Sequence, residues 1–349
     1  MAHPSPFADY LAARLPLVER ALTDAAAAPL TNGAASDDLR GYLYDPLARF
    51  TASGGKRVRP ALCLLGAEAV GGRAEDALSC AVAVELFQSA ALIHDDIADE
   101  GELRRGEPCL HRVEGTGLAI NAGDLALTQV FEAVLGDARL DAEHRVRVLA
   151  ELALMERHTL EGQALDLGWV RDGRWDVTPD DYAYMVTSKT AWYTVASPLV
   201  LGALAAGGSP AAADGLRSLG LAAGVAFQVQ DDLLNLVGDA AAQGKDFRSD
   251  ITEGKRTLAV VWALAHLGAA ERKELIGLLG SHVTGTAEKD RAVELIERGG
   301  GIEHCRELAQ ERAHAAQDAA DELARDGRIT VEARDLLRAM ADFFVERAS

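Results

Sequence analysis

Hydrophobic positions along the chain recur at the spacing of an α-helix. Two stripes with steps of three, four or seven residues illustrate this, namely Leu78, Val82, Leu86 and Ile93, and then Val146, Leu149, Ala153 and Leu160. Such steps keep side chains on one helical face. Alternation of apolar and polar residues does not extend beyond a few positions, and no Asn-Gly or Asp-Gly hairpin signal lies between such runs. The pattern predicts an all-α protein.

Turn-forming residues interrupt the helical pattern repeatedly. The breaks are rich in Gly, Pro, Ser and Asp, and they lie at 51–55, 71–72, 101–108, 171–173, 207–210 and 237–254. They divide the chain into about ten to twelve helices. None of them is long or simple enough in composition to be an interdomain linker. Residues 1–349 are therefore expected to form one domain, a single large helical bundle.

Two acidic clusters end two of the apolar helices. The first contains Asp95, Asp96 and Asp99, and the second contains Asp231 and Asp232, with Asp231 lying 136 positions after Asp95. On a helix Asp95 and Asp99 lie one turn apart on the same face, where their like charges repel. Magnesium would compensate them, since it prefers one or two carboxylates together with phosphate oxygens. The alternative is that each cluster is a solvated helix end.

Cations are concentrated near these clusters. A Gly-Gly turn precedes Lys56, Arg57 and Arg59, and glycine allows the backbone to approach an anion closely. Further cations follow the first cluster and flank the second, namely Arg104, Arg105, Lys189, Lys245, Lys255 and Arg256. Guanidinium groups bind phosphates through paired hydrogen bonds. The combination indicates an anionic, metal-chelating ligand such as a diphosphate, although a charged surface turn would also explain the Gly-Gly segment taken alone.

The bulk properties narrow the choice of function. The chain has 54 acidic and 35 basic residues, giving a formal net charge of −19, which argues against a nucleic-acid partner. Its four cysteines lack Cys-x-x-Cys spacing and are expected to be reduced thiols. No secretory signal is visible, and the best apolar run, near 196–206, is too short to span a bilayer. We therefore expect a cytoplasmic protein without a transmembrane segment.

Taken in order, these motifs resemble one family, the trans-prenyl diphosphate synthases (polyprenyl synthetases). The matching elements are G-G-K-R-V-R-P at 54–60, D-D-I-A-D at 95–99, R-R-G at 104–106, the 162–166 segment, S-K-T at 188–190, F-Q-V-Q-D-D at 227–232 and D-I-T-E-G-K-R-T at 250–257. Each motif is weak alone, but the ordered set is specific. The resemblance implies an all-α isoprenoid synthase fold around a central cavity. It also implies a magnesium-dependent prenyltransferase that joins isopentenyl diphosphate to an allylic diphosphate, and a homodimer.

The resemblance also implies a role for each site residue. Asp95 and Asp99 are expected to hold two magnesium ions on the allylic diphosphate, and Asp231 a third from the opposite wall, with Asp96 in the same catalytic cluster. Contacts to that diphosphate are expected from Arg104, Lys189 and Lys245. The diphosphate of isopentenyl diphosphate is expected to contact Lys56, Arg59, Gln88 and Arg105. Thr190 and Gln228 are expected beside the reacting carbons, and no residue is proposed as a general base.

Two positions depart from the family pattern. Asn235 stands where the second cluster usually ends in Asp, and an amide offers an oxygen ligand without a charge. This predicts weaker metal affinity but not loss of activity. Arg248 replaces a residue that is commonly small, and its side chain is expected either to reach the diphosphate or to point into solvent.

The helix that leads to Asp95 is expected to line a pocket for the growing chain. Ala90 and Ala91 are small, so the first turn should not block growth, whereas relatives that stop at fifteen carbons commonly carry an aromatic residue there. Phe87 lies about 12 Å further down the helix axis, and with Phe131 it is expected to form a floor. This predicts a product of twenty to twenty-five carbons. Both rings are equally well explained as ordinary core residues.

Two other readings stay open. A class I terpene cyclase would share the helical fold and an aspartate-rich helix, but would lack G-G-K-R-V-R-P and would carry a different second metal motif. A catalytically altered regulatory subunit of a prenyl synthase would be expected to lack an acidic cluster, and only Asn235 favours this reading. No hydrolase motif is present among the nine His residues or elsewhere.

Overall fold

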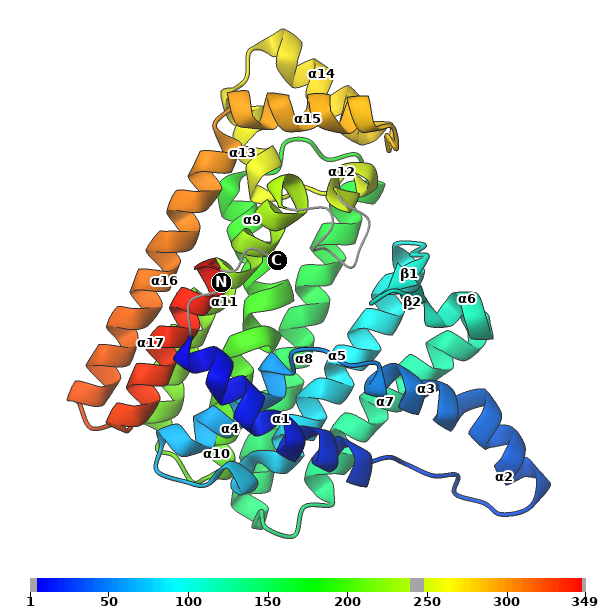
Figure 1. Cartoon of the computed structure of the whole chain (residues 1–349), viewed down its shortest axis with the longest axis vertical. Helices are drawn as coiled ribbons and strands as arrows, with labels where there is room; N and C mark the ends of the chain where they lie inside the picture. The colour runs from blue at the N-terminus through cyan, green and yellow to red at the C-terminus, as the bar shows by residue number, and fades with distance from the viewer. Residues whose placement is uncertain (1–4, 239–247, 347–349) are drawn as a thin grey trace. The chain divides into compact units, whose positions relative to one another are not determined.

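The computed structural model describes residues 5–238 and 248–346, and this part of the chain is almost entirely helical (Figure 1). It contains twelve α-helices of nine or more residues, together with several shorter ones. The predicted all-α class is therefore confirmed. The expected breaks are confirmed as well: α3 ends at Ala52 and α4 begins at Val58, while α10 ends at Ala205 and α11 begins at Pro210.

The contacts divide the chain into two compact units. The first comprises Met1–Ala153, Ser197–Leu216 and Leu323–Leu336. Its elements are α1 (Pro6–Asp24), α2 (Ala34–Leu39), the π-helical η1 (Arg40–Tyr44), α3 (Asp45–Ala52), α4 (Val58–Ala69), the 3₁₀-helix η2 (Ala74–Ala77), α5 (Leu78–Ala98), β1 (Leu103–Arg104), β2 (Glu107–Pro108), α6 (Leu110–Glu114), α7 (Thr116–Leu135) and α10 (Ser197–Ala205).

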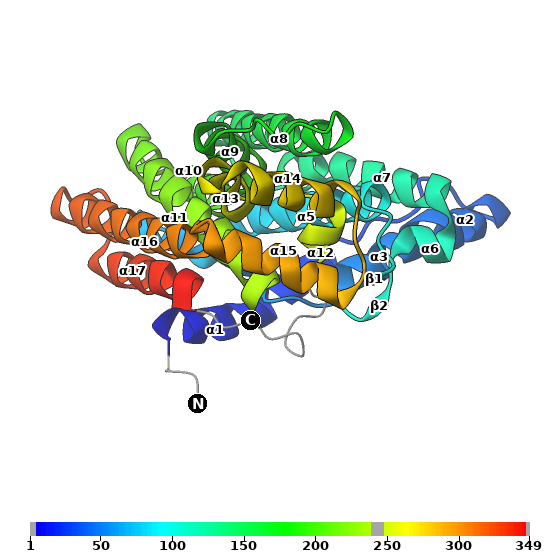
Figure 2. The same cartoon turned by 90° about the horizontal axis from the view of Figure 1, so that it is seen from above.

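The second unit comprises Leu154–Ala196, Arg217–Glu322 and Leu337–Ser349. Its elements are α9 (Pro179–Val186), the π-helical η3 (Thr187–Ala196), α12 (Ser249–Glu253), α13 (Leu258–His266), α14 (Ala269–Gly280) and α15 (Thr286–Arg298). Helices α14 and α15 pack side by side (Figure 2). Four longer helices contribute residues to both units, namely α8 (Ala142–Arg171), α11 (Pro210–Val237), α16 (Gly301–Arg325) and α17 (Val331–Glu346).

The core of the first unit forms where α5 packs along α7. Ala90 and Ile93 of α5 meet Ala119, Ala122 and Ala126 of α7 in one buried cluster. Small residues on both helices allow this close packing, and burial of the apolar face stabilises it. Both helices are long and apolar enough to cross a membrane by length and composition, but 78% of the window within 74–98 is buried inside the protein.

The structure contains one strand pair that the sequence did not predict. Leu103 pairs with Pro108 and Arg104 with Glu107 in an antiparallel hairpin. The two turn residues, Arg105 and Gly106, have φ values of 56° and 83°. Two consecutive residues with positive φ are typical of a type I′ turn, which favours Asn-Gly or Asp-Gly over the Arg-Gly found here. The hairpin was missed because its turn residue is an arginine.

The predicted apolar stripe of α8 is present, but it is not part of the core. Val146 is 65% exposed and Leu160 is 64% exposed, and Leu167 is also exposed. The periodicity correctly predicted the helix, and the structure adds that this face is exposed in the single chain. By contrast, Val82, Leu86 and Ile93 of the α5 stripe are all buried. The four cysteines are free and buried, as expected of reduced thiols.

Candidate active site

The first acidic cluster lies at the carboxyl end of α5. Asp95 is half-buried, Asp96 is only 3% exposed, and Asp99 is exposed at the helix terminus. The Asp99 N–H donates to the Asp95 carbonyl at 2.8 Å, so the two residues are one helical turn apart, as predicted. Asp95 and Asp99 can therefore offer carboxylate oxygens to solvent, whereas Asp96 turns into the protein.

Asp96 is held by Arg104 from strand β1. Arg104 Nε donates to the Asp96 carboxylate oxygens at 2.9 and 3.2 Å, and Nη2 donates to Oδ1 as well. Burial alone would lower the pKa of Arg104, but the hydrogen bonds and the charge of Asp96 outweigh it and raise that pKa. The contacts to described residues use Nε and Nη2, so Nη1 is the part of the guanidinium that can face an anion.

The Gly-Gly turn ends at Arg57, whose side chain points inward. Arg57 has a φ of 47° and its side chain is 2% exposed. Its Nη1 donates to Glu85 at 2.5 Å, its Nε to Glu19 at 2.7 Å and its Nη2 to the Thr51 carbonyl at 2.7 Å. The sequence analysis grouped Arg57 with the cations of a diphosphate cradle. The structure instead gives it an anchoring role, since its guanidinium is committed to protein oxygens.

Arg105 lies over the Gly-Gly turn. Its Nη1 donates to Ser53 Oγ at 2.9 Å, and a Cβ on Gly55 would lie 3.3 Å from its Nη2. Burial lowers the pKa of Arg105, the charge of Glu85 opposes this shift, and the nearby charges of Arg57, Arg104 and Arg59 lower the pKa further. Neighbouring cations repel one another, and a bound anion would relieve that repulsion. Of the residues predicted to bind isopentenyl diphosphate, the structure thus brings Arg59 and Arg105 together.

The remaining first-unit predictions lie on α5 and α7. Gln88 is 8% exposed, and its Oε1 has no hydrogen-bond partner among the described residues. Phe87 is 3% exposed, and Phe131 of α7 is half-buried. Ala90 is fully buried against α7, so close helix packing by itself explains its small size. Ala91 is half-buried.

The second acidic cluster, in the second unit, also has one outward and one inward carboxylate. Asp231 is exposed, whereas Asp232 is buried. Asp232 accepts hydrogen bonds of 2.7 Å from Tyr182 and of 2.7 Å from Gln228. Burial and the neighbouring Asp250 carboxylate raise the pKa of Asp232, and the two hydrogen bonds oppose this shift. Gln228, predicted to lie near the reacting carbons, is thus oriented by Asp232.

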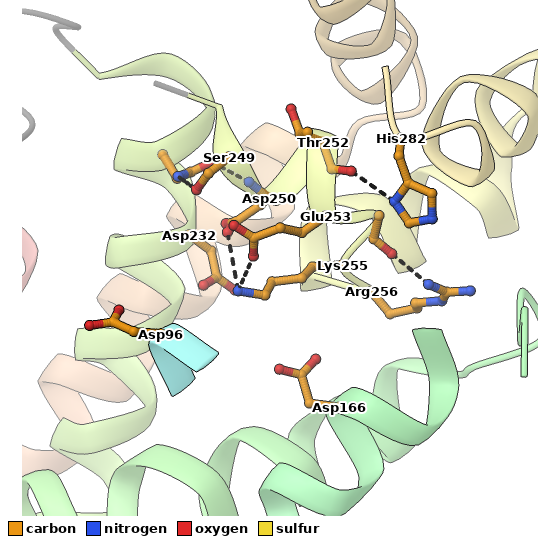
Figure 3. A network of polar contacts seen from close by, with 12 residues as sticks. Asp96, Asp166, Asp232, Ser249, Asp250, Thr252, Glu253, Lys255, Arg256 and His282 are labelled. Carbon is orange, nitrogen blue, oxygen red and sulfur yellow. Dashed lines mark hydrogen bonds and ion pairs between the residues drawn. The ribbon is translucent and has the colours of Figure 1, made fainter. Parts of the chain in front are cut away.

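Lys189 is paired with a carboxylate that the sequence analysis did not assign to the site. Its Nζ lies 2.5 Å from Asp166 Oδ2, and Thr190 beside it is 5% exposed. Burial alone would raise the pKa of Asp166, but the charges of Lys189 and Lys255 outweigh it and hold that pKa below its ordinary value. Lys255 also pairs with Glu253 and lies 4.0 Å from Asp250 (Figure 3). Asp166 lies within the matched 162–166 segment, and Lys255 lies within the matched 250–257 motif. These two family motifs were the only features of the sequence that could have assigned Asp166 and Lys255 to the site.

Both departures from the family pattern make defined contacts. Asn235 Oδ1 accepts from the Asp250 N–H at 3.3 Å, and its Nδ2 donates to Ser249 Oγ at 3.2 Å, so the amide supports the start of α12. Arg248 donates from Nε to the Leu236 carbonyl at 3.1 Å and pairs with Asp290 of α15. The Arg248 side chain is 16% exposed, so it does not simply point into solvent, and its contact with the diphosphate stays a prediction. Lys245 lies outside the described residues.

The carboxylates that remain accessible suit magnesium. Within 5–238 and 248–346 no three His, Cys, Asp or Glu side chains converge as a ready-made metal cage. Magnesium does not require one, because it keeps several waters and takes substrate phosphate oxygens as ligands. Asp95 and Asp99 of the first unit and Asp231 of the second are half-buried or exposed carboxylates, the type of oxygen donor that magnesium prefers. The bridging of Asp95 and Asp231 by one ligand stays a prediction.

Known proteins are similar to this chain in sequence and in fold. Residues 40–296 match the polyprenyl synthetase family. The chain is 40% identical over 295 residues to the short chain isoprenyl diphosphate synthase of Methanothermobacter thermautotrophicus, covering 84% of this chain and 87% of that protein. It is 37% identical to the geranylfarnesyl diphosphate synthase of Natronomonas pharaonis, covering 88% and 90%. The geranylgeranyl pyrophosphate synthase of Corynebacterium glutamicum, solved with isoprenyl diphosphate and magnesium, has a TM-score of 0.81 and 31% identity, covering 98% of this chain and 97% of that one.

Proposed function

The chain belongs to the polyprenyl synthetase family, and on that premise we propose that the residues above bind and activate the two diphosphates of a prenyl transfer. The enzyme is a prenyl diphosphate synthase, which condenses isopentenyl diphosphate with an allylic diphosphate. The observation that carries the residue assignment is the position of Arg105 over the Gly-Gly turn, where its Nη1 donates to Ser53 Oγ and its Nη2 lies against Gly55. In a chain with a net charge of −19, cations gathered at such a turn would form an anion site.

Isopentenyl diphosphate is assigned to this cluster. Lys56, Arg59 and Arg105 would bind its diphosphate, with Gln88 offering a buried amide nearby on α5. Arg57 would not touch the substrate. It holds the Gly-Gly turn to α5 through Glu85, so that the turn presents Lys56 and Arg59 in a fixed geometry.

The allylic diphosphate is assigned to the two acidic clusters. Asp95, Asp99 and Asp231 would hold magnesium, with Arg104, Lys189 and Lys245 as direct cationic contacts. Magnesium bound there would neutralise the charge that develops on the leaving diphosphate. Two of the flanking cations are already oriented, since Arg104 is held by Asp96 and Lys189 by Asp166. Fixed cations stabilise developing charge without having to reorganise during the reaction.

Thr190 and Gln228 would face the allylic carbons. Their oxygens would favour the positive charge left when the carbon–oxygen bond breaks, after which the isopentenyl double bond attacks and a proton is lost. The Gln228 amide donates its Nε2 hydrogen to Asp232, and this contact leaves its oxygen for the substrate. No side chain in this set is assigned as the base.

The product is proposed to contain twenty to twenty-five carbons. A geranylfarnesyl diphosphate synthase and a geranylgeranyl pyrophosphate synthase are among the proteins this chain is similar to. Phe87, buried two turns before Asp95, together with Phe131, would close the pocket beyond Ala91. We expect Phe87→Ala to lengthen the product by about one isoprene unit, because it removes a large ring from the floor. Products sized by chromatography at the wild-type length would refute the floor assignment.

The enzyme is proposed to act as a homodimer in the cytoplasm. Helix α8 carries an apolar stripe that includes Val146, Leu160 and Leu167, all exposed in the single chain. Large exposed apolar stripes are typical of protein interfaces. A second copy of the chain would cover it by the two-fold self-association common among enzymes.

One assay tests the proposed function. Purified full-length protein is mixed with Mg²⁺ and isopentenyl diphosphate, separately with C5, C10 and C15 allylic diphosphates, and the products are sized. We expect elongation with at least one primer, and no elongation when EDTA removes the metal. No elongation with any primer would favour a regulatory subunit. Hydrocarbon formation without incorporation of isopentenyl diphosphate would favour a terpene cyclase.

A further inference from the structure

The segment that carries Lys189 and Thr190 is a π-helix. Element η3 runs for ten residues, Thr187–Ala196, between the α-helices α9 and α10. A π-helix bonds residue i to i+5, so each turn holds more residues and is wider than an α-turn. Long π-helices are rare, and the single π-turns found within α-helices frequently occur at functional sites. The surroundings of η3 must therefore favour this form.

Glycines on two neighbouring helices make room for the wide backbone. A Cβ on Gly162 of α8 would lie 2.2 Å from the Lys189 nitrogen. On α11, a Cβ on Gly224 would lie 2.5 Å from the Ala191 Cα, and one on Gly220 would lie 2.4 Å from the Ala196 Cα. Real Cβ atoms essentially never approach so closely. The two helices thus approach η3 at distances that only glycine permits.

Side chains on the same faces of α8 and α11 form a clamp on the ring of Trp192 in η3. Trp192 stacks on His158 of α8, with ring centroids 4.1 Å apart, and the Arg217 guanidinium of α11 lies 5.1 Å from its ring centroid. His158 is one turn before Gly162, and Arg217 is one turn before Gly220. On each helix, the residue that contacts Trp192 and the glycine therefore lie along one face. The contacts on the Trp192 ring restrict rotation of η3 about its axis, and the glycines allow η3 to approach α8 and α11 closely.

The next turn of each helix reaches the proposed active site. On α8 the series continues from Gly162 to Asp166, which pairs with Lys189 Nζ at 2.5 Å. On α11 it continues from Gly224 to Gln228, which donates to Asp232 at 2.7 Å. A shift of η3 along the faces of α8 and α11 that contact it would move Lys189 and Thr190 relative to Asp166 and Gln228.

We propose that Gly162 and Gly224, with the clamp on Trp192, are positioning residues that hold η3 as a π-helix and thereby align Lys189 and Thr190 with the allylic diphosphate. This inference rests on the proposed function, which assigns that diphosphate to Lys189. A methyl group on Gly162 would lie 2.2 Å from the Lys189 nitrogen, and ordinary van der Waals contact begins at 3.4 Å, so the Lys189 backbone would have to move by more than about 1 Å. A misplacement of about 1 Å can lower a rate about 100-fold.

The test compares three alanine variants of the full-length enzyme with Mg²⁺ and both substrates. Gly162→Ala is expected to lower kcat/KM for the allylic diphosphate about 100-fold. It should leave the KM for isopentenyl diphosphate unchanged, because Lys56, Arg59 and Arg105 lie in the first unit. Gly220→Ala introduces a similar clash seven residues away, at Ala196, and should lower the thermal midpoint comparably with a much smaller kinetic effect. Gly168→Ala is the matched control on α8, since a Cβ there has nothing within 4 Å.

Two outcomes would overturn the inference. One is a folded Gly162→Ala enzyme with wild-type allylic kinetics, and the other is an equal kinetic loss in Gly162→Ala and Gly220→Ala at equal thermal midpoints. If Gly162→Ala does not fold, Trp192→Leu decides instead, because it removes the clamp without adding a clash. It is expected to lower allylic kcat/KM about tenfold through misalignment, and an unchanged value would refute the proposal. Failure of the proposed function is separate, since the wild-type enzyme itself would then not elongate any primer.

Discussion

Replacing Arg57 with methionine removes the cation from a buried ion pair behind the Gly-Gly turn. The Arg57 side chain is 2% exposed and the Glu85 side chain 6% exposed, with 2.5 Å between Nη1 and Oε1. Removing one partner of such a pair leaves the other charge buried and costs about 3–5 kcal/mol. Losing the hydrogen bond to the Thr51 carbonyl adds about 1 kcal/mol. The contact to Glu19, which is 42% exposed, should add less than about 1 kcal/mol.

The pH dependence identifies the cause. Without the guanidinium, Glu85 would keep a buried negative charge with no cation beside it, and that charge destabilises the folded variant. Acid neutralises carboxylates, so the deficit of the variant relative to wild type should be smaller at low pH. Urea unfolding followed by far-UV circular dichroism should therefore show a larger deficit relative to wild type at pH 8 than at pH 5.

The double variant Arg57→Met/Glu85→Met separates stability from function. Replacing both charges with apolar groups of similar size is often neutral, so it should recover stability to within about 1 kcal/mol of wild type. The turn would still lack its anchor on Thr51, and the KM for isopentenyl diphosphate should rise about tenfold, equivalent to about 1.4 kcal/mol. The reasoning is refuted if the single variant loses under about 1 kcal/mol at pH 8, or if its deficit grows as the pH falls.

Three further predictions follow from other contacts. Asp166→Asn should lower allylic kcat/KM about tenfold, because Lys189 loses the carboxylate that orients it; steady-state kinetics with an unchanged allylic value would contradict this. Burial raises the pKa of Glu156 to about 7 from an ordinary 4.5, so wild-type stability should fall as the pH rises through that window, and Glu156→Gln should be more stable than wild type in urea at pH 8 but similar at pH 4.5. Leu160→Glu should raise the dimer dissociation constant about 30-fold, since an unpaired carboxylate buried at an interface costs about 2 kcal/mol, and light scattering that shows an unchanged dimer would reject the α8 stripe as the interface.

Helical periodicity and turn residues were sufficient to predict the class and many helix boundaries, because both depend on local chemistry. The same periodicity could not distinguish a face buried in the core from one exposed in the single chain. The stripe through Val146 and Leu160 has the same spacing as the buried stripe on α5, and only tertiary contacts separate them. The π-helical form of η3 was also invisible, since it depends on glycines of α8 and α11 that are distant in sequence.

The sequence shows where charged residues occur, but the role of each charged side chain was harder to predict. Arg57 and Arg59 look equivalent in the sequence, yet Arg57 has a left-handed backbone conformation and a buried guanidinium. The Arg105 turn was missed for a related reason, since an arginine with positive φ has no sequence signature. In both cases the arginine side chain bonds to a residue just before the Gly-Gly turn, Arg57 to the Thr51 carbonyl and Arg105 to Ser53 Oγ.

The helical positions of the two aspartates in each pair predict which one is buried and which one faces outward. Asp96 lies three residues after the buried Ile93, and Asp232 lies three residues after the buried Val229, so each shares a face with the core. Asp95 and Asp231 precede them by one residue and therefore turn away from it. The inner aspartate of each pair binds protein, Asp96 through Arg104 and Asp232 through Tyr182 and Gln228. On the proposed function, a doubled aspartate in the last two turns of an apolar helix combines two roles: the outer carboxylate would bind a metal, and the inner one orients a residue that would contact the substrate.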